Sequence, residues 1–326
     1  MKEQVQALVR VCRMMISKAG KPGEPGSGVF STNQLSVAAS SRGRALAGYL
    51  AENFLITEEE ASDLIDFGSV QINGRQERSP GRLLEGSEEI RIYWPWQGVR
   101  RHYGLDPGRI VYRDRYLLAY DKEAGIPSQQ TPADAYNNLY AAVFRYLKEE
   151  GRGEPYVALH HRLDRETSGV MLFALDRSVN GKLGSAFEHH RVVKDYLACV
   201  LGNPSFDSMT AREDIGRKAG RYTVCPRGEG KAAETSLKVI HRGEGRTLVL
   251  AHPRTGRTHQ IRLHLSHLGH PVLGDRLYGG GAAKRLYLHA YRLRLAHPAT
   301  GSELTLMAPV PPDWPQAAAI QDSLHI

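Results

Sequence analysis

The hydrophobic positions of residues 42–95 predict two short helices followed by a hairpin. Leu46 and Leu50 recur at helical spacing. Thr57 stands three residues before a glutamate, the spacing of a capping box that opens a second helix. Asn73-Gly74 lies between two alternating segments, which is typical of a hairpin turn. We therefore expect a compact module of two helices, a hairpin and a closing strand.

A longer region follows, in which strand-like and helical patterns are mixed. Strand patterns cover residues 110–120, 170–175, 192–201 and 247–251, and helical patterns cover 135–148, 179–190 and 258–268. Because hairpin-connected strands accompany the helices, this region predicts an α+β fold with a mixed or antiparallel sheet.

Composition shifts divide the chain into five segments. Residues 1–41, with a short helical pattern before Lys18 and a Gly- and Pro-rich stretch after it, read as a flexible N-terminal extension. The other segments are the module at 42–95, a linker at 96–108, the large domain at 109–315 and a C-terminal tail at 316–326.

Charge and cysteine content narrow the class of protein. The chain has 43 Lys and Arg against 35 Asp and Glu, a net charge of +8, which favours a polyanionic partner. Its three cysteines lack paired spacing, which argues against disulfides and a cysteine zinc site. No apolar run of transmembrane length, secretion signal or glycine-rich phosphate loop is evident. We expect a cytoplasmic protein without a nucleotide cofactor.

The first cluster of candidate chemistry is the segment 160–169. It precedes an apolar strand, so it should lie in a loop at a strand edge, where functional groups gather. Asp164 lies between Arg162 and Arg165, and adjacent cations favour the ionised carboxylate that nucleophilic attack requires. The alternative is a salt-bridged structural loop.

A second cluster is Lys194-Asp195-Tyr196. On a strand, Lys194 and Tyr196 would project to one side and Asp195 to the other. The tyrosine could stack on a base or accept a proton. The alternative is a tyrosine packed in an ordinary strand.

The third cluster runs from Pro253 to His264, where a strand turns into a helix. Arg262 falls at the edge of the buried stripe of that helix, from which it could pair with a catalytic carboxylate. Residues 212–262 hold 12 basic and 5 acidic residues, a stretch suited to phosphate contact. The alternative for each single arginine is a solvated surface charge.

The sequence disfavours a metal site and a serine hydrolase site. His264, His267 and His270 are three apart, but Gly269 and a proline break the helix before the third, so we expect no metal site. Ser168 lacks a nucleophile-elbow sequence, which disfavours a serine hydrolase.

Together the clusters resemble the RluA group of RNA pseudouridine synthases over about residues 109–311. The matching motifs are His161-Arg162-Leu163-Asp164 with Thr167-Ser168-Gly169, then Lys194-x-Tyr196, Gly230 to Thr235, Thr255 to Arg262, and Gly274-Asp275-x-x-Tyr278-Gly279. Lys122-Glu123-Ala124-Gly125 departs from the group's usual Lys-Pro-Ala-Gly. Residues 42–95 resemble the alpha-L RNA-binding module of small-subunit ribosomal proteins, a usual companion in that group.

The resemblance implies a fold and residue roles. Asp164 would be the catalytic aspartate, Tyr196 the active-site tyrosine and Arg262 the cation paired with the aspartate. The catalytic domain would have a mixed, largely antiparallel sheet with a central cleft, and would convert uridine in RNA to pseudouridine without cofactor or metal. The expected RNA contacts are Arg162, Arg165, Lys194, Arg254, Arg257, His259 and Gln260, with Arg42, Arg44 and Arg75 in the module.

The functional hypothesis is a monomeric isomerase of uridines in structured RNA that flips its target base, with large-subunit ribosomal RNA favoured as substrate. Transfer RNA as substrate, an RNA N-glycosidase, and a non-catalytic RNA-binding or ribosome-assembly factor are the alternatives. Residues 42–95 hold 6 basic and 10 acidic residues, so the module could position the protein more than bind phosphates.

Overall fold

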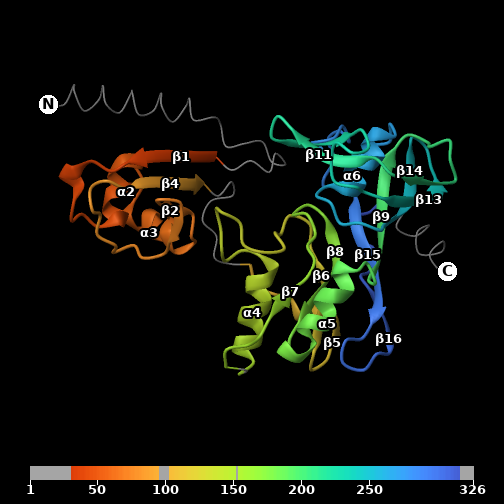
Figure 1. Cartoon of the computed structure of the whole chain (residues 1–326), viewed down its shortest axis with the longest axis horizontal. Helices are drawn as coiled ribbons and strands as arrows, with labels where there is room; N and C mark the ends of the chain where they lie inside the picture. The colour runs from red at the N-terminus through yellow and green to blue at the C-terminus, as the bar shows by residue number, and fades with distance from the viewer. Residues whose placement is uncertain (1–30, 95–102, 152, 316–326) are drawn as a thin grey trace. The chain divides into compact units, whose positions relative to one another are not determined.

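The computed structural model describes residues 31–94, 103–151 and 153–315, which form two compact units (Figure 1). Unit 1 takes its described residues from Met1–Tyr103 and Gln129–Ala142, and unit 2 from Gly104–Ser128 and Val143–Ile326. The helix expected before Lys18, most of the linker at 96–108 and the C-terminal tail lie outside the described residues.

Unit 1 contains the two helices and the hairpin that the sequence predicts. Its elements are β1 (Ser31–Ser36), a short 3-10 helix (Ala39–Ser41), α2 (Leu46–Phe54), α3 (Glu58–Asp66), β2 (Val70–Ile72), β3 (Arg75–Glu77) and β4 (Glu89–Trp94). The strands form an antiparallel sheet in the order β1-β4-β2-β3. Thr57 and Glu60 close the capping box of α3, and Leu46, Leu50 and Ile65 lie in the core of the unit.

Two parts of unit 1 were not predicted. β1 pairs with β4, although residues 1–41 were expected to be a flexible extension. Its sequence, Ser-Thr-Asn-Gln-Leu-Ser, is almost wholly polar, so it carries no hydrophobic alternation to mark a strand. The segment Gln129–Ala142 also belongs to unit 1: Ala135 donates to the carbonyl of Phe67 at 2.9 Å, and the Tyr136 ring packs on that of Phe67.

Unit 2 carries the remaining elements. They are a 3-10 helix (Pro107–Arg109), β5 (Ile110–Arg113), β6 (Leu117–Lys122), α4 (Leu139–Glu149, whose first residues fall in unit 1), β7 (Ala158–Leu159), β8 (Ser168–Ala174), α5 (Arg177–Glu188), β9 (Val193–Leu201), β10 (Ser208–Ala211), β11 (Asp214–Lys218), β12 (Arg221–Cys225), β13 (Thr235–Arg242), β14 (Arg246–Pro253), α6 (Gln260–His267), β15 (Leu288–Ala296) and β16 (Glu303–Met307).

The main sheet of unit 2 is mixed and largely antiparallel, as predicted. Its strand order is β10-β13-β14-β9-β15-β8-β6-β5, with β16 paired to β15 and β7 to β8. Only the pairing of β15 with β8 is parallel among the described strands of this sheet. Here a Cβ on Gly169, which has φ +115°, would lie 2.2 Å from the carbonyl oxygen of Ala290. A glycine is therefore required where β8 meets β15.

Two boundaries of elements after residue 109 differ from the prediction. The strand pattern at 110–120 is a hairpin of β5 and β6, because the Asp114 carboxylate accepts hydrogen bonds from the amides of Tyr116 and Leu117 and turns the chain. The helix expected from residue 135 begins at Leu139, where the Asn138 side chain accepts from the Ala141 amide.

Candidate active site

Asp164 lies in the loop between β7 and β8, and the backbone of this loop is anchored on both sides of it. The Ser128 hydroxyl accepts from the Leu163 amide at 3.0 Å and donates to the Leu163 carbonyl at 2.6 Å. The Arg165 carbonyl accepts from the buried ammonium of Lys122 at 3.1 Å. The side chain of Asp164 remains 28% exposed. The loop thus presents a fixed carboxylate that a substrate can reach.

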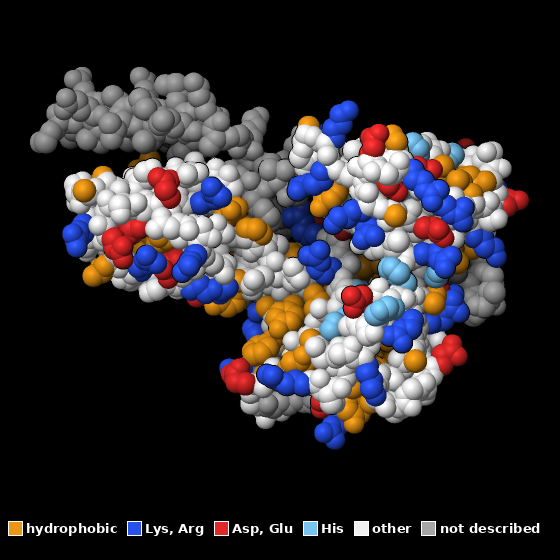
Figure 2. Space-filling model, in the orientation of Figure 1, with side chains coloured by type: hydrophobic (Ala, Val, Ile, Leu, Met, Phe, Trp, Pro, Cys, Tyr) orange, Lys and Arg blue, Asp and Glu red, His pale blue; other side chains and the backbone are white. Residues whose placement is uncertain are grey.

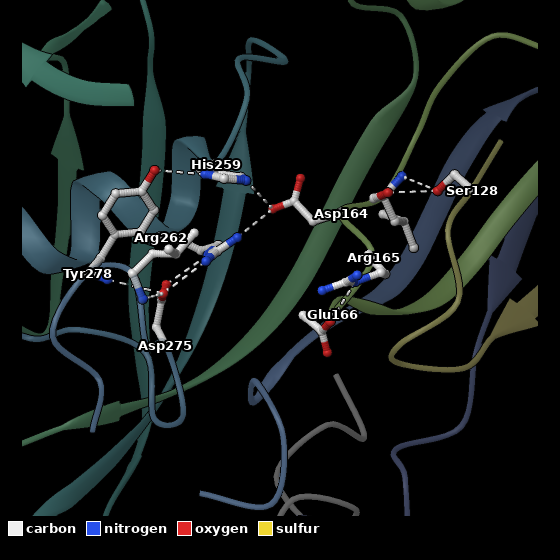
Figure 3. A network of polar contacts seen from close by, with 10 residues as sticks. Ser128, Asp164, Arg165, Glu166, His259, Arg262, Asp275 and Tyr278 are labelled. Atoms are coloured by element: carbon white, nitrogen blue, oxygen red, sulfur yellow. Dashed lines mark hydrogen bonds and ion pairs between the residues drawn. The ribbon is translucent and has the colours of Figure 1, made fainter. Parts of the chain in front are cut away.

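Arg262 of α6 holds this carboxylate (Figure 3). Its Nη1 donates to Oδ2 of Asp164 at 3.1 Å, while Nε and Nη2 donate to the two oxygens of Asp275 at 2.7 and 2.8 Å. Burial opposes the charge, but the hydrogen bonds that Arg262 donates to Asp275 and the charge of Asp164 raise the pKa of Arg262 above its ordinary value. Arg262 is therefore a permanent cation with both carboxylates as partners.

The cation that pairs with Asp164 is not one of its sequence neighbours. Nε of Arg165 bonds instead to Glu166 at 2.8 Å, and Arg162 is exposed. The flanking arginines thus form no ion pair with Asp164 among the described residues, whereas the pairing with Arg262 that the resemblance implies is present. Arg262 is also 5% exposed rather than at the edge of the buried stripe, because the two carboxylates compensate its charge inside the protein.

The strand β9 presents its residues as the alternation predicts. Asp195 bonds to His252 at 3.0 Å and to Arg292 at 2.8 Å. Tyr196 is half-buried, and both its burial and the charge of Asp164 raise its pKa, so the phenol stays protonated at neutral pH. The charge of Asp164 thus acts on the Tyr196 phenol.

Lys194 of β9 has no hydrogen bond or ion pair among the described residues, and burial lowers its pKa. Its Nζ lies beside the turn before α6, since a Cβ on Gly256 would be 4.0 Å away. A partly buried amine without a partner in the described part of the chain is suited to an anion supplied by a ligand.

The comparisons with known proteins agree with this geometry. Residues 116–267 match the family model described as RNA pseudouridylate synthase. The chain is 32% identical over 296 residues to a ribosomal large subunit pseudouridine synthase C of Salmonella typhi, covering 81% of this chain and 90% of that protein. It is 31% identical over 302 residues to a ribosomal large subunit pseudouridine synthase D of Vibrio parahaemolyticus, covering 84% and 90%.

The chain belongs to the RluA group of RNA pseudouridine synthases. A solved structure, human RNA pseudouridylate synthase domain containing 1, is also similar, with 30% identity, a TM-score of 0.53 and coverage of 65% of this chain and 90% of that one. The protein is accordingly an RNA-uridine isomerase. None of the helices in the described part of the chain has the length and apolarity needed to cross a membrane.

In this pseudouridine synthase, the residues around α6 that were expected to contact RNA differ in how exposed their side chains are. Arg254 is exposed and makes a 3.4 Å contact with Glu234, and Arg257 donates from Nε to the Ala232 carbonyl at 2.9 Å. Gln260 was expected among the RNA contacts, whereas its side chain is 4% exposed. Its amide nitrogen donates to Glu234 and Thr235, and its oxygen accepts from Thr255 and Arg257. The buried side chain of Gln260 therefore stabilises the turn that precedes α6.

The expected contacts in unit 1 are only partly available. Arg42 and Arg75 are exposed, but Arg44 is paired with Glu52 and lies over the ring of Tyr49. Figure 2 shows red and blue side chains interspersed on the visible face of unit 1, and blue side chains gathered over the part of unit 2 that carries β11, β13 and β14. The stronger positive surface in this view is therefore on unit 2.

Two of the residues considered for a metal or hydrolase site, His264 and Ser168, have partners inside the protein. His264 bonds to Thr235 at 2.9 Å and to the carbonyl of Glu213 at 3.0 Å. Ser168 is buried and bonded to His289 at 2.8 Å, so its hydroxyl is closed to a substrate.

Sequence reasoning assigned no role to Asp275, Tyr278 or Lys122. Asp275 is 1% exposed and accepts two hydrogen bonds from Arg262. The Arg262 guanidinium lies over the Tyr278 ring, 5.2 Å from its centroid. Lys122 is buried and donates to three backbone carbonyls around the Asp164 loop. The only sequence signal for Asp275 and Tyr278 was the motif from Gly274 to Gly279, which matches the family. Spacing alone does not show that an aspartate in this turn contacts Arg262.

Proposed function

We propose that this enzyme isomerises specific uridines of large-subunit ribosomal RNA, with Asp164 as its nucleophile. The substrate class rests on the relatives, which are ribosomal large subunit pseudouridine synthases. The role of Asp164 rests on one observation: its carboxylate is reachable by a ligand, yet it is held by a buried arginine that a second carboxylate orients. Such a preorganised charge is what covalent catalysis needs.

The reaction conserves atoms and electrons. A carboxylate oxygen of Asp164 bonds to the nucleoside while the bond between N1 of uracil and C1′ of ribose breaks. The base turns within the site, a bond forms between C5 and C1′, and the carboxylate leaves. One proton leaves C5 and one is taken up at N1, so no redox partner or group donor enters the balance. The side chains around Asp164 hold the detached base close to the ribose, which makes the second bond-forming step intramolecular.

Two residues are suited to an extruded base. A uridine in structured RNA must leave its stack to reach Asp164. Arg162 is exposed two residues before Asp164, from where its guanidinium fills the vacated space and contacts phosphates. Tyr196 contacts the base through its ring, because a phenol with a raised pKa is a poor proton acceptor at neutral pH.

The rest of the chain supports substrate binding in this account. The module expected at 42–95 positions the enzyme on RNA, with Arg42 and Arg75 as its accessible cations, and the positive stretch at 212–262 contacts phosphates. The catalytic domain extends over about residues 109–315, and the enzyme works as a cytoplasmic monomer without a cofactor.

The substrate assignment is tested by mapping pseudouridines, after carbodiimide modification, in total RNA from cells with and without the gene. We expect signals lost from the large-subunit ribosomal RNA and restored by the wild-type gene, but not by the Asp164→Asn form. Loss confined to transfer RNA would overturn the substrate class. Free uracil and abasic sites, formed by the purified enzyme on the same RNA, would instead identify an N-glycosidase.

A further inference from the structure

The imidazole of His259 lies between the hydroxyl of Tyr278 and the carboxylate of Asp164 (Figure 3). Its Nδ1 is 2.7 Å from the Tyr278 oxygen, and its Nε2 is 3.8 Å from Oδ2 of Asp164. His259 precedes α6 and has φ +57°, a left-handed conformation. Histidine is among the few non-glycine residues that adopt this conformation readily. The backbone turn therefore points the ring back toward the Asp164 loop.

The two polar neighbours of the His259 ring together favour one tautomer, because the Tyr278 hydroxyl can donate or accept at Nδ1 whereas the Asp164 carboxylate only accepts. Burial raises the pKa of Tyr278 to about 12, so its hydroxyl keeps its proton and can donate to Nδ1. Burial also lowers the pKa of His259, which keeps the ring neutral at pH 7. A neutral ring that accepts at Nδ1 bears its hydrogen on Nε2, the atom that faces Asp164. The opposite tautomer would direct a lone pair at the carboxylate.

Arg262 and His259 approach the same oxygen of Asp164. Nη1 of Arg262 and Nε2 of His259 both face Oδ2, and no donor among the described side chains contacts Oδ1. The two oxygens of the carboxylate are therefore inequivalent. One is held by the protein, and the other is left for the nucleoside.

We propose that His259 is a positioning residue that donates from Nε2 to Oδ2 of Asp164 and so makes Oδ1 the attacking oxygen. This inference rests on the proposed role of Asp164 as nucleophile. The 3.8 Å separation is longer than a hydrogen bond, and it shortens when the substrate fills the site, as catalytic hydrogen bonds commonly do. The ionisable groups that face the imidazole are Asp164, Arg262, Asp275, Tyr278 and Tyr222.

Two amide substitutions separate this role from a packing role. His259→Gln places an N–H donor near the Nε2 position, whereas His259→Asn carries the same amide on a side chain one methylene shorter. At saturating RNA in single-turnover experiments, we expect His259→Asn to slow pseudouridine formation about 10- to 100-fold, the effect of losing one hydrogen bond to a charged group. His259→Gln should recover most of that rate, and RNA affinity should change less than about twofold in both. His267→Asn, on the exposed side of α6, is the matched control and should match wild type.

The contribution of Tyr278 is tested in the same assay. Tyr278→Phe removes the hydroxyl that bonds to Nδ1 of His259, so it should slow pseudouridine formation when added to the wild-type enzyme. Added to His259→Asn, it should cause no further loss, because the two substitutions act through the same hydrogen bond in a double-mutant cycle. Equal rates for Asn and Gln at position 259, a loss of RNA affinity alone, or independent effects of the two substitutions would overturn the inference. Failure of the proposed function has a different signature, namely an Asp164→Asn enzyme that keeps its activity.

Discussion

The guanidinium of Arg262 donates a hydrogen bond of 3.1 Å to Oδ2 of Asp164, a residue 98 positions earlier in the chain. The loop before β8 supplies the carboxylate and α6 supplies the cation, so the pair exists only once the sheet has brought these elements together. A substrate-accessible anion is thereby fixed to a buried cation, an arrangement that keeps the carboxylate oriented before RNA binds.

The bidentate contact between Asp275 and Arg262 is expected to support both stability and activity. Asp275→Asn leaves the shape but removes the charge that compensates a buried guanidinium. We expect the free energy of unfolding to fall by about 3 kcal/mol, because removing one charge of a buried ion pair leaves the opposite charge buried without that partner. The rate of pseudouridine formation should fall as well. Denaturant unfolding and single-turnover kinetics measure the two effects, and an unchanged stability would contradict the structural role.

Gly169 is expected to tolerate no side chain. In Gly169→Ala the new methyl group would overlap the Ala290 backbone at a φ of +115°, so we expect loss of soluble folded protein or severe destabilisation. Gly181→Ala in α5 is the matched control, since a Cβ there meets nothing within 4 Å. That variant should be as stable as wild type or more stable by up to about 1 kcal/mol. Thermal unfolding of both variants distinguishes a steric requirement from a general sensitivity to alanine.

Stability should decrease as the pH falls below 6.5, in part because of His161. Nε2 of His161 accepts from the Leu172 amide at 2.9 Å, and burial lowers the pKa of His161 to about 3. Between pH 6.5 and 3 the unfolded chain therefore binds a proton that the folded protein excludes, so this contribution is full above pH 6.5 and is lost on acidification.

The variant His161→Gln offers an acceptor that does not titrate. We expect the difference in unfolding free energy between pH 7 and pH 5 to be smaller in this variant by about 2 kcal/mol. Urea unfolding at the two pH values provides the measurement. An identical pH dependence in wild type and variant would show that His161 is not the group responsible.

Lys194 is expected to bind a phosphate of the substrate. Lys194→Gln should reduce the slope of log affinity against log salt concentration by about 0.7 to 0.9, the value for one lost phosphate contact. Stability should not decrease, because the amine has no partner among the described residues. Lys182→Gln, on the exposed side of α5, removes the same charge and should leave the slope unchanged. Equal slopes for wild type and Lys194→Gln would rule out the contact.

Local features of the fold followed from the sequence, and long-range partners did not. The capping box at Thr57 and the turn at Asn73-Gly74 depend on residues within a few positions, so spacing predicts them. β1 was not predicted, because this polar strand is stabilised by backbone pairing with β4 rather than by a buried hydrophobic face.

The candidate site shows the same division. The family resemblance picked out Asp164, Tyr196 and the pairing of Asp164 with Arg262, whereas the local pattern alone showed only the adjacent arginines, because a sequence displays neighbours and not spatial partners. The link from Arg262 to Asp275 and the burial of Gln260 depend on the register of β13 and β14 and on the docking of α6. Those relations follow from the folded sheet and have no counterpart in local spacing.

The most direct test of the account compares Asp164→Asn with Glu166→Gln in single-turnover pseudouridine formation on the RNA substrate. Both substitutions remove a carboxylate from one loop, but only Asp164 bonds to Arg262. We expect Asp164→Asn to lose at least about a thousandfold in rate while its free energy of unfolding changes by about 1 kcal/mol or less, and Glu166→Gln to keep wild-type activity. A folded Asp164→Asn enzyme with an undiminished rate would contradict the central claim.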